Sequence, residues 1–467
     1  MTLVRIRRLL TGLLLVVGAF PGLASAQPTA ADPMAPRQPL PAPPGLRPFV
    51  TPAEIAVREL SLEEATAIAL ENQPQIQARF GDYAAALQRI NQALSPLLPQ
   101  LSASAGGTRT DLATRVFQGS GSSFAGTVSA GGTGRLSASQ LLWDFGKNWA
   151  ATDAAKANAE SSREDVELQK DLIVLAVKEQ YFNLLFAARL VVVSAQALDR
   201  ADLNLRSAKG FFEVGTRPKS DVTRAEVDVA NARLDLIRAQ NAVSLARIAL
   251  NTAMGISINA PTRVKDILTY EKFTVDRDTL VAEALRRRPE QRQAKFRADA
   301  AEATVRQTFR DFFPQFSATG SVGGSTTRAD SLSVTNTESG DWTLGVQLTW
   351  SIFDGGNKIA RWKEAKASLD AAKARVRDSE LTIWQQVEQA YVNVNEAEER
   401  IGAAQKAVES AQENFRLFQG RFDAGVGNII ELTDAQLALT RAQSAEAQAL
   451  ADFRIAIARL ERSVGRR

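Results

Sequence analysis

The chain has 467 residues and a formal charge of +4, from 56 Lys and Arg against 52 Asp and Glu. It contains no cysteine and no histidine, which excludes disulfides, Cys–His and Ser–His–Asp nucleophilic chemistry and histidine-ligated zinc. No glycine-rich phosphate loop follows a predicted buried strand, so we expect no catalytic site, no metal site and no cofactor.

The first 26 residues have the layout of a secretory signal peptide. Basic residues precede an apolar run over 9–20, and Ala24-Ser25-Ala26 forms a small-residue cleavage site before Gln27. This segment carries three arginines and no acidic residue, so the mature charge is about 4 − 3 = +1, which gives no reason to expect a nucleic-acid partner. No uninterrupted apolar run of about 18 residues follows it, so we expect no helical membrane span, and any membrane crossing must be a closed β-barrel.

Segment 27–52 is dense in proline. Proline lacks the backbone N–H that helices and sheets need, so the pattern predicts an extended, flexible tether. A polyproline ligand for a partner is the alternative, but no clear repeated PxxP spacing favours it.

The remainder is a tandem duplication, with one unit at 53–256 and the other at 257–467. Motifs recur in the same order about 210–215 residues apart, which predicts two copies of one structural unit. The matched motifs are Leu98-Pro99-Gln100-Leu101 with Phe313-Pro314-Gln315-Phe316, Trp143-Asp144-Phe145-Gly146 with Phe353-Asp354-Gly355-Gly356, and Phe212-Glu213-Val214-Gly215 with Phe422-Asp423-Ala424-Gly425.

Each unit predicts a helix, two strands and then long helices. The strands are expected at about 97–143 and 312–353, where Ser, Thr and Gly alternate with apolar residues. The alternation is clearest over 342–352 and predicts a strand with one apolar face and one face of small polar side chains.

The long helices carry a coiled-coil pattern. Over 358–420 apolar residues, many of them alanine, recur at spacings of three and four, and 148–210 is the equivalent run. A helix of that length extends roughly 90 Å. Glycine-containing turns near 213–220 and 423–430 then reverse the chain.

Four strands per chain cannot close a membrane barrel, because the smallest such barrels use about eight. Unpaired strand edges are not tolerated in lipid. The chain is therefore expected to associate with further copies of itself, and three copies would supply twelve strands.

In the order and duplication of these motifs the chain resembles the TolC-like outer-membrane efflux and secretion proteins. The resemblance covers the chain beyond the proline-rich segment. It implies a mixed α/β membrane protein whose homotrimer forms a 12-stranded transmembrane β-barrel in the outer membrane, continued by an α-helical barrel in the periplasm. It also implies a passive channel that works with a periplasmic adaptor and an inner-membrane transporter.

Two other functions stay open at this stage. The duct could serve a type I protein secretion system rather than small-molecule efflux, because one channel type serves both. A periplasmic coiled-coil scaffold or adaptor is the alternative from another class, and the duplicated alternating strands argue against it.

Four aromatic residues lie where strands give way to helices: Trp143, Phe145, Trp350 and Phe353. They could form an aromatic girdle at the membrane interface, or they could pack the strand–helix junction.

The two glycine-containing turns predict exposed tips, which the resemblance identifies as the surface met by the adaptor. The residues are Gly215, Thr216, Arg217, Gly425, Val426 and Gly427. Turn chemistry alone would also explain the glycines.

A periplasmic gate is expected beside these turns. By resemblance, Glu431 and Asp434 fall where the family's constriction carries acidic residues, and Ser220 with Asp221 where a neighbouring helix supplies hydrogen-bond partners. The carboxylates could instead complement helix N-termini. Gly427 and Phe422 stand where the family's locking arginine and tyrosine are expected, so closure could involve Arg217 instead.

Overall fold

The computed structural model describes residues 59–118, 121–272, 277–330 and 334–467. The predicted signal peptide (1–26) and proline-rich segment (27–52) lie outside these residues. The elements of the first unit are β1 (Glu59–Leu60), α2 (Leu62–Asn72), α3 (Pro74–Leu94), the short 3₁₀ helix η2 (Ser95–Leu97), β2 (Gln100–Gln118), β3 (Gly121–Trp143), α4 (Lys147–Glu213) and α5 (Lys219–Met254).

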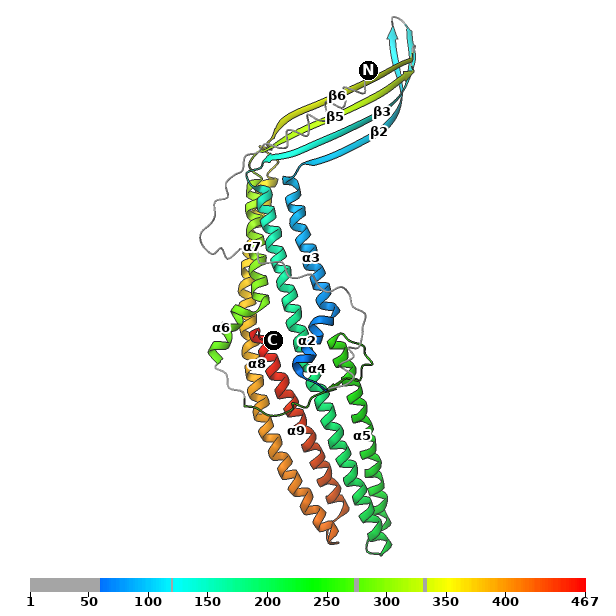
Figure 1. Cartoon of the computed structure of the whole chain (residues 1–467), viewed down its shortest axis with the longest axis vertical. Coiled ribbons are helices and arrows are strands. Elements are labelled where there is room, and N and C mark those ends of the chain that lie inside the picture. Colours follow the sequence, from blue (N-terminus) through cyan, green and yellow to red (C-terminus); the bar gives the residue numbers. More distant parts are fainter. Residues whose placement is uncertain (1–58, 119–120, 273–276, 331–333) are drawn as a thin grey trace. The chain divides into compact units, whose positions relative to one another are not determined.

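The second unit repeats this order. Its elements are β4 (Arg263–Val264), α6 (Arg277–Arg287), α7 (Pro289–Arg310), β5 (Gln315–Asp330), β6 (Val334–Thr349), α8 (Asn357–Asp423) and α9 (Ile429–Val464). Both α4 and α8 have 67 residues, and both α5 and α9 have 36. The duplicated sequence therefore folds into duplicated structure, with paired long helices below a shared sheet in the view of Figure 1.

Glycine marks the start and the end of the long helices in both units. Gly146 and Gly356 precede α4 and α8 with φ of 82° and 88°, and Gly255 and Gly465 follow α5 and α9 with φ of 69° and 81°. Only glycine adopts this left-handed conformation without a steric cost. These glycines thus mark where α4 and α8 begin and where α5 and α9 end.

The four long strands form one antiparallel sheet in the order β2-β3-β5-β6. The two hairpins meet along β3 and β5, so the units share one sheet (Figure 1). Within the described residues, β2 and β6 each pair on one side alone, which leaves two open edges. β6 ends at Thr349, three residues before the expected end of the alternating run.

The two faces of the sheet differ in chemistry. On one face Leu136, Val322 and Trp342 lie in register across three strands, with exposed fractions of 42%, 55% and 74%. On the other, Ser137, Ser321 and Thr343 share a row, and the Ser321 and Thr343 hydroxyls lie 2.8 Å apart. Directly paired residues lie on the same face, so at this level the sheet is apolar on one side and polar on the other.

The helices pack through the predicted seam. Ile383, Val387, Val394 and Ile401 of α8 are each no more than 3% exposed, and they form a core with α6 and α9. A second core joins α2, α4 and α5, where Tyr181 donates hydrogen bonds to the carbonyl oxygens of Leu60 (3.0 Å) and Lys265 (2.8 Å). These bonds anchor the small parallel pair β1–β4.

Within the part of the chain that the structure describes, one helix is long and apolar enough by length and composition to cross a membrane. α4 contains an 18-residue window of mean hydropathy 1.5 with at most two charged residues, and 33% of the window is buried. The sequence argument against helical spans therefore does not hold for α4 on composition alone. The core helix of a water-exposed bundle passes the same test, and α4 supplies Tyr181, Phe182, Leu184 and Leu185 to the core.

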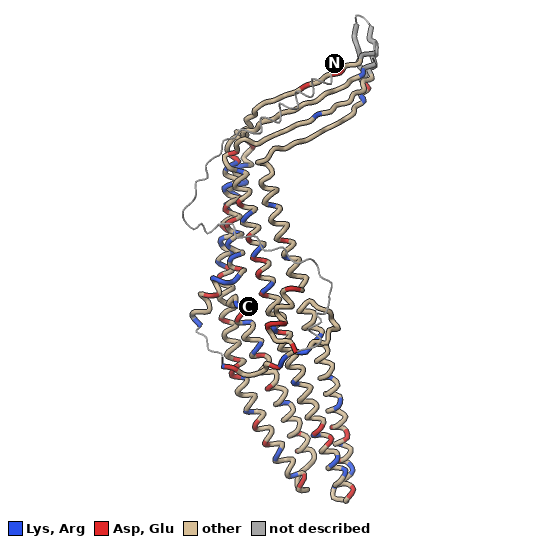
Figure 2. The backbone as a smooth tube through the Cα atoms, viewed as in Figure 1, with Lys and Arg blue, Asp and Glu red and all other residues tan. Residues whose placement is uncertain are grey.

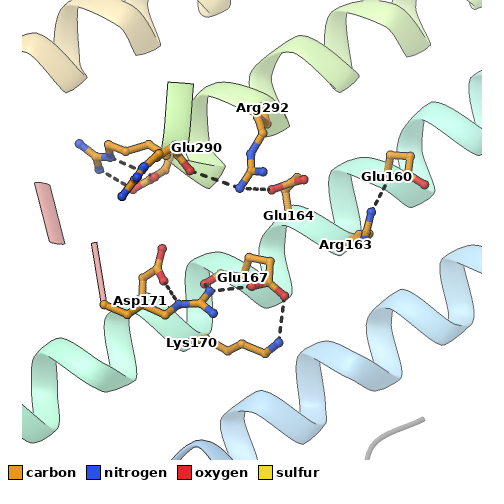
Figure 3. A network of polar contacts seen from close by, with 11 residues as sticks. Glu160, Arg163, Glu164, Glu167, Lys170, Asp171, Glu290 and Arg292 are labelled. Carbon is orange, nitrogen blue, oxygen red and sulfur yellow. Dashed lines mark hydrogen bonds and ion pairs between the residues drawn. The ribbon is translucent and has the colours of Figure 1, made fainter. Parts of the chain in front are cut away.

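Charge is concentrated in the helices, whereas the sheet carries few charged side chains (Figure 2). Some of these charged side chains form ion pairs between the two units, as Figure 3 shows. Arg292 of α7 pairs with Glu164 of α4 at 3.0 Å, and Arg467 at the chain end pairs with Glu167 and Asp171 at 2.6 Å. Ion pairs thus link the first unit to the start of α7 and to the C-terminus.

Candidate functional site

The two helix-reversing turns lie together and share one apolar core. Its buried members come from all four long helices: Ala208, Ala225, Phe422, Ile429 and Leu432. Phe422 is fully buried, and the Phe211 ring stands edge-on to it with centroids 5.7 Å apart. The turns of the first and second unit are therefore packed into one structure, which we call the tip.

Arg217 connects the two turns of the tip. Its Nη2 donates to the carbonyl oxygen of Gly427, 210 residues further along the chain, and its Nη1 lies 3.5 Å from Asp221 Oδ2. The guanidinium stacks over Phe422, 4.7 Å from the ring centroid. Only 12% of the Arg217 side chain is exposed. A charge-assisted bond, an ion pair and a cation–π contact thus converge on one side chain.

The predicted exposure of the tip is wrong for two residues. Arg217 is largely buried for the reason just given, and Gly427 is buried because its backbone packs on the preceding turn. A Cβ at Gly427 would lie 2.8 Å from the backbone nitrogen of Phe422. The other tip residues are exposed: Gly215, Thr216, Gly425 and Val426.

Besides Arg217, the four other residues predicted to contribute to a gate have different surroundings. Asp221 lies in the first turn of α5 and pairs with Arg217. Glu431 lies in the first turn of α9, and both Glu431 and Asp434 are exposed. Among the described residues neither has an ion-pair partner, and Ser220 is exposed as well. The first-turn placement of Asp221 and Glu431 also suits the helix dipole.

Two polar contacts near the tip were not predicted. Thr433 Oγ1 donates to Asp228 Oδ2 at 2.9 Å, and Asn204 Nδ2 donates to Gln436 Oε1 at 2.7 Å. Each joins the first unit to the second. No local sequence signal singles these residues out, because they are ordinary polar positions on long helices.

The aromatic residues at the strand–helix junctions divide between packing and exposure. Phe145 stacks on Phe313 with centroids 5.2 Å apart, and Trp143 lies edge-on to Phe145 at 6.1 Å. Trp350 Nε1 donates to the carbonyl oxygen of Phe312 at 3.0 Å. Phe353 is 85% exposed. Contacts at the strand–helix junction therefore account for Trp143, Phe145 and Trp350. A role of these aromatic residues in a membrane-interface girdle stays a prediction.

Comparison with known proteins follows the same division of the chain. The sequence profile described as "Outer membrane efflux protein" matches residues 66–256 and 280–466, one match in each unit. The chain belongs to the outer membrane efflux protein family. Its place is the outer membrane, and the resemblance to TolC-like proteins is confirmed.

Relatives of this outer membrane efflux protein match over most of their length. Outer membrane protein TolC of Vibrio cholerae is 25% identical over 421 residues, which cover 88% of this chain and 92% of the relative. Pyoverdine export outer membrane protein OpmQ of Pseudomonas aeruginosa is 24% identical over 392 residues, covering 82% and 81%.

Solved structures support the fold. The CmeC outer-membrane channel of Campylobacter jejuni is similar with a TM-score of 0.70 at 20% identity, covering 86% of this chain and 85% of that one. VceC of Vibrio cholerae gives 0.69 at 18% identity, covering 86% and 96%. The predicted tandem unit of long helices and a β-hairpin is confirmed as the fold of outer-membrane channels.

Proposed function

We propose that three copies of this chain form a passive duct through which an efflux system releases its substrates across the outer membrane. The observation that carries the proposal is the sheet, which has two open edges and two faces of opposite chemistry. Pairing β6 of one copy with β2 of the next would close twelve strands into a barrel. The Trp342 face would then meet lipid and the Thr343 face would line a wet lumen.

Exposed apolar residues on the long helices also favour association with further copies. α5 carries a series of such side chains, each 41–58% exposed: Val227, Leu234, Ile237, Leu245 and Ile248. Their spacing keeps them near one side of the helix, and in a trimer a neighbouring copy would bury them. The helices would thereby continue the barrel as a tube in the periplasm.

The tip is the surface we assign to the periplasmic adaptor. Val214 and Val426 are 71% and 73% exposed, an unusual degree for apolar side chains on two adjacent turns. A partner protein that covered both would remove this apolar surface from water. The adaptor would in turn connect the duct to an inner-membrane transporter, which supplies the energy and the direction of transport.

Glu431 and Asp434 are the residues we assign to the periplasmic gate. Threefold symmetry would bring six exposed carboxylates into a ring, and such a concentration of negative charge attracts cations. Arg217 holds the two turns of one copy together. We infer that it stabilises the closed tip in place of the locking residues of other family members.

Small-molecule efflux is the substrate class we propose. The matched relatives include outer membrane proteins named for pyoverdine export, for an antibiotic efflux pump and for a toluene efflux pump. These chains are 24–25% identical to this one. The proposed duct binds no cofactor and catalyses no reaction.

Native mass spectrometry of the detergent-extracted outer-membrane fraction tests the proposal. A trimer in that fraction, with cation-conducting pores after reconstitution, is the expected result. A water-soluble monomer or dimer in the periplasmic fraction would contradict the duct and favour a coiled-coil scaffold.

A further inference from the structure

Among the residues that the structure describes, the polar face of the sheet carries one pair of opposite charges and no other. The described residues of this face lie at alternate positions of 100–110, 129–141, 315–327 and 337–349. Apart from Arg135 and Asp341, they are Ser, Thr, Gly and Gln, with one leucine. Within the described residues, a lining of neutral side chains is thus interrupted at a single level.

Arg135 and Asp341 form a direct pair across two strand spacings. Nη2 of Arg135 lies 2.9 Å from Asp341 Oδ2 and 3.1 Å from Oδ1, and Nη1 donates to Ser321 Oγ at 2.8 Å. Arg135 lies on β3 and Asp341 on β6, with β5 between them. Both side chains remain 45–49% exposed, so the pair faces the space in front of the sheet.

Gly323 makes this reach possible. It is the residue of β5 that pairs with both Arg135 and Asp341. A Cβ at Gly323 would lie 2.8 Å from the carbonyl oxygen of Gly134 and 3.3 Å from the Arg135 Cβ. A side chain there would occupy the path of the guanidinium, so the glycine keeps the space above β5 open.

From this geometry we propose that Arg135 and Asp341 determine the charge selectivity of the barrel lumen. The inference rests on the proposed trimeric duct. There, three copies of the pair would lie at one level as a ring whose charges cancel, because each arginine is matched by an aspartate 2.9 Å away. The barrel would then discriminate little between anions and cations, which suits a duct for substrates of either charge.

Removing one partner should expose the charge of the other. Arg135→Gln leaves three unpaired carboxylates in the lumen, and Asp341→Asn leaves three unpaired guanidinium groups. At moderate ionic strength we expect the potassium-to-chloride permeability ratio to rise on the order of twofold in the first case and to fall by a similar factor in the second. The opposite directions separate selectivity from a loss of sheet stability, which would affect both variants alike.

The experiment measures reversal potentials of purified trimers in planar bilayers under a KCl gradient. Every protein carries Glu431→Gln and Asp434→Asn, so that the acidic ring proposed for the gate does not set the ratio. Arg135→Gln, Asp341→Asn, their combination and the exchange Arg135→Asp with Asp341→Arg are compared. The combination and the exchange both keep the lumen neutral and should return the ratio of the parent.

Arg109→Gln is the matched control. Arg109 pairs with Ala130, which lies on the same face of β3 as Leu136. Arg109 is therefore on the Trp342 face of the sheet, opposite the polar face, and it is exposed. Its loss removes the same charge without changing the lumen, so the ratio should stay constant.

The inference is overturned if the single variants leave the ratio unchanged, move it in the same direction, or move it no further than Arg109→Gln does. In that outcome a conducting parent leaves the proposed duct intact. A parent trimer that conducts no ions would instead overturn both proposals.

Discussion

Replacing Arg217 with alanine should open the tip. The side chain donates to the carbonyl oxygen of Gly427 and covers the Phe422 ring, which are two contacts between the turns, and it pairs with Asp221 beside its own turn. Truncation to alanine removes all three contacts. The turns belong to helix pairs from different units. Their separation is the motion we expect to widen the periplasmic entrance.

The magnitude follows from the burial of these contacts. A hydrogen bond to a charged donor contributes about 1.5–3 kcal/mol, and a cation–π contact about 0.5–2 kcal/mol. Because one side chain makes all of the contacts they do not add fully, and we take about 2–3 kcal/mol in total. If the closed tip alone has these contacts, the ratio of open to closed states rises about 30- to 150-fold.

Single-channel recording of reconstituted trimers measures this ratio as the open probability. Arg416→Ala is the control, because Arg416 pairs with Glu413 at 2.6 Å but both side chains are more than half exposed, and water screens such a surface pair so that it contributes little to stability. An open probability unchanged in Arg217→Ala, with the trimer intact, would refute the assignment of the closed tip to Arg217.

Three further predictions concern the sheet, the charged network and the core. Trp342→Lys should reduce heat-stable trimer in the outer-membrane fraction, because a charge on the lipid face costs about 2–4 kcal/mol at mid-membrane. The adjacent Thr343→Lys, on the polar face, should reduce it far less, and equal losses would contradict the assigned faces. Burial alone would raise the pKa of Glu290, but bonds from Arg288 and the nearby Arg462 outweigh it and hold the pKa below its ordinary 4.5. Because its pKa is lower in the folded protein than in the unfolded chain, ionised Glu290 stabilises the fold at pH values above its unfolded pKa. This stabilisation is lost as the pH falls through the pKa of Glu290 in the folded protein. The thermal midpoint should therefore drop more between pH 7 and the acid range in the parent than in Glu290→Gln, and parallel pH profiles would contradict the cause. Tyr181→Phe removes the hydroxyl donor of the Lys265 carbonyl oxygen, whereas the Leu60 carbonyl oxygen still accepts from the Lys265 backbone N–H at 3.0 Å, and should cost about 0.5–1.5 kcal/mol. Chemical unfolding measures this cost, and an unchanged midpoint would count against the anchor.

The fold was predictable because its signals are local and repeated. A spacing of three and four over 358–420 predicts a helix wherever it occurs, and α8 spans Asn357–Asp423. Alternation over 342–352 predicts a strand with two unlike faces, and the register places Trp342 and Thr343 on opposite sides. The residues of the predicted gate and the adaptor surface are positioned at the tip, but their roles stay predictions.

The sequence by itself determined the duplication, the order of elements, the helix-bounding glycines and the contrast between the two faces of the strands. These properties depend on neighbours a few residues apart, or on comparing one unit with the other.

Tertiary structure alone decided which distant residues meet. Arg135 bonds Asp341, 206 residues away, and Arg217 bonds Gly427, 210 residues away. Both contacts depend on how β3 lies against β5 and how the two turns pack at the tip, and no local period encodes that packing. The burial of Gly427 comes from packing on Arg421 and Phe422 of the preceding turn, which the presence of a glycine in a turn does not by itself indicate.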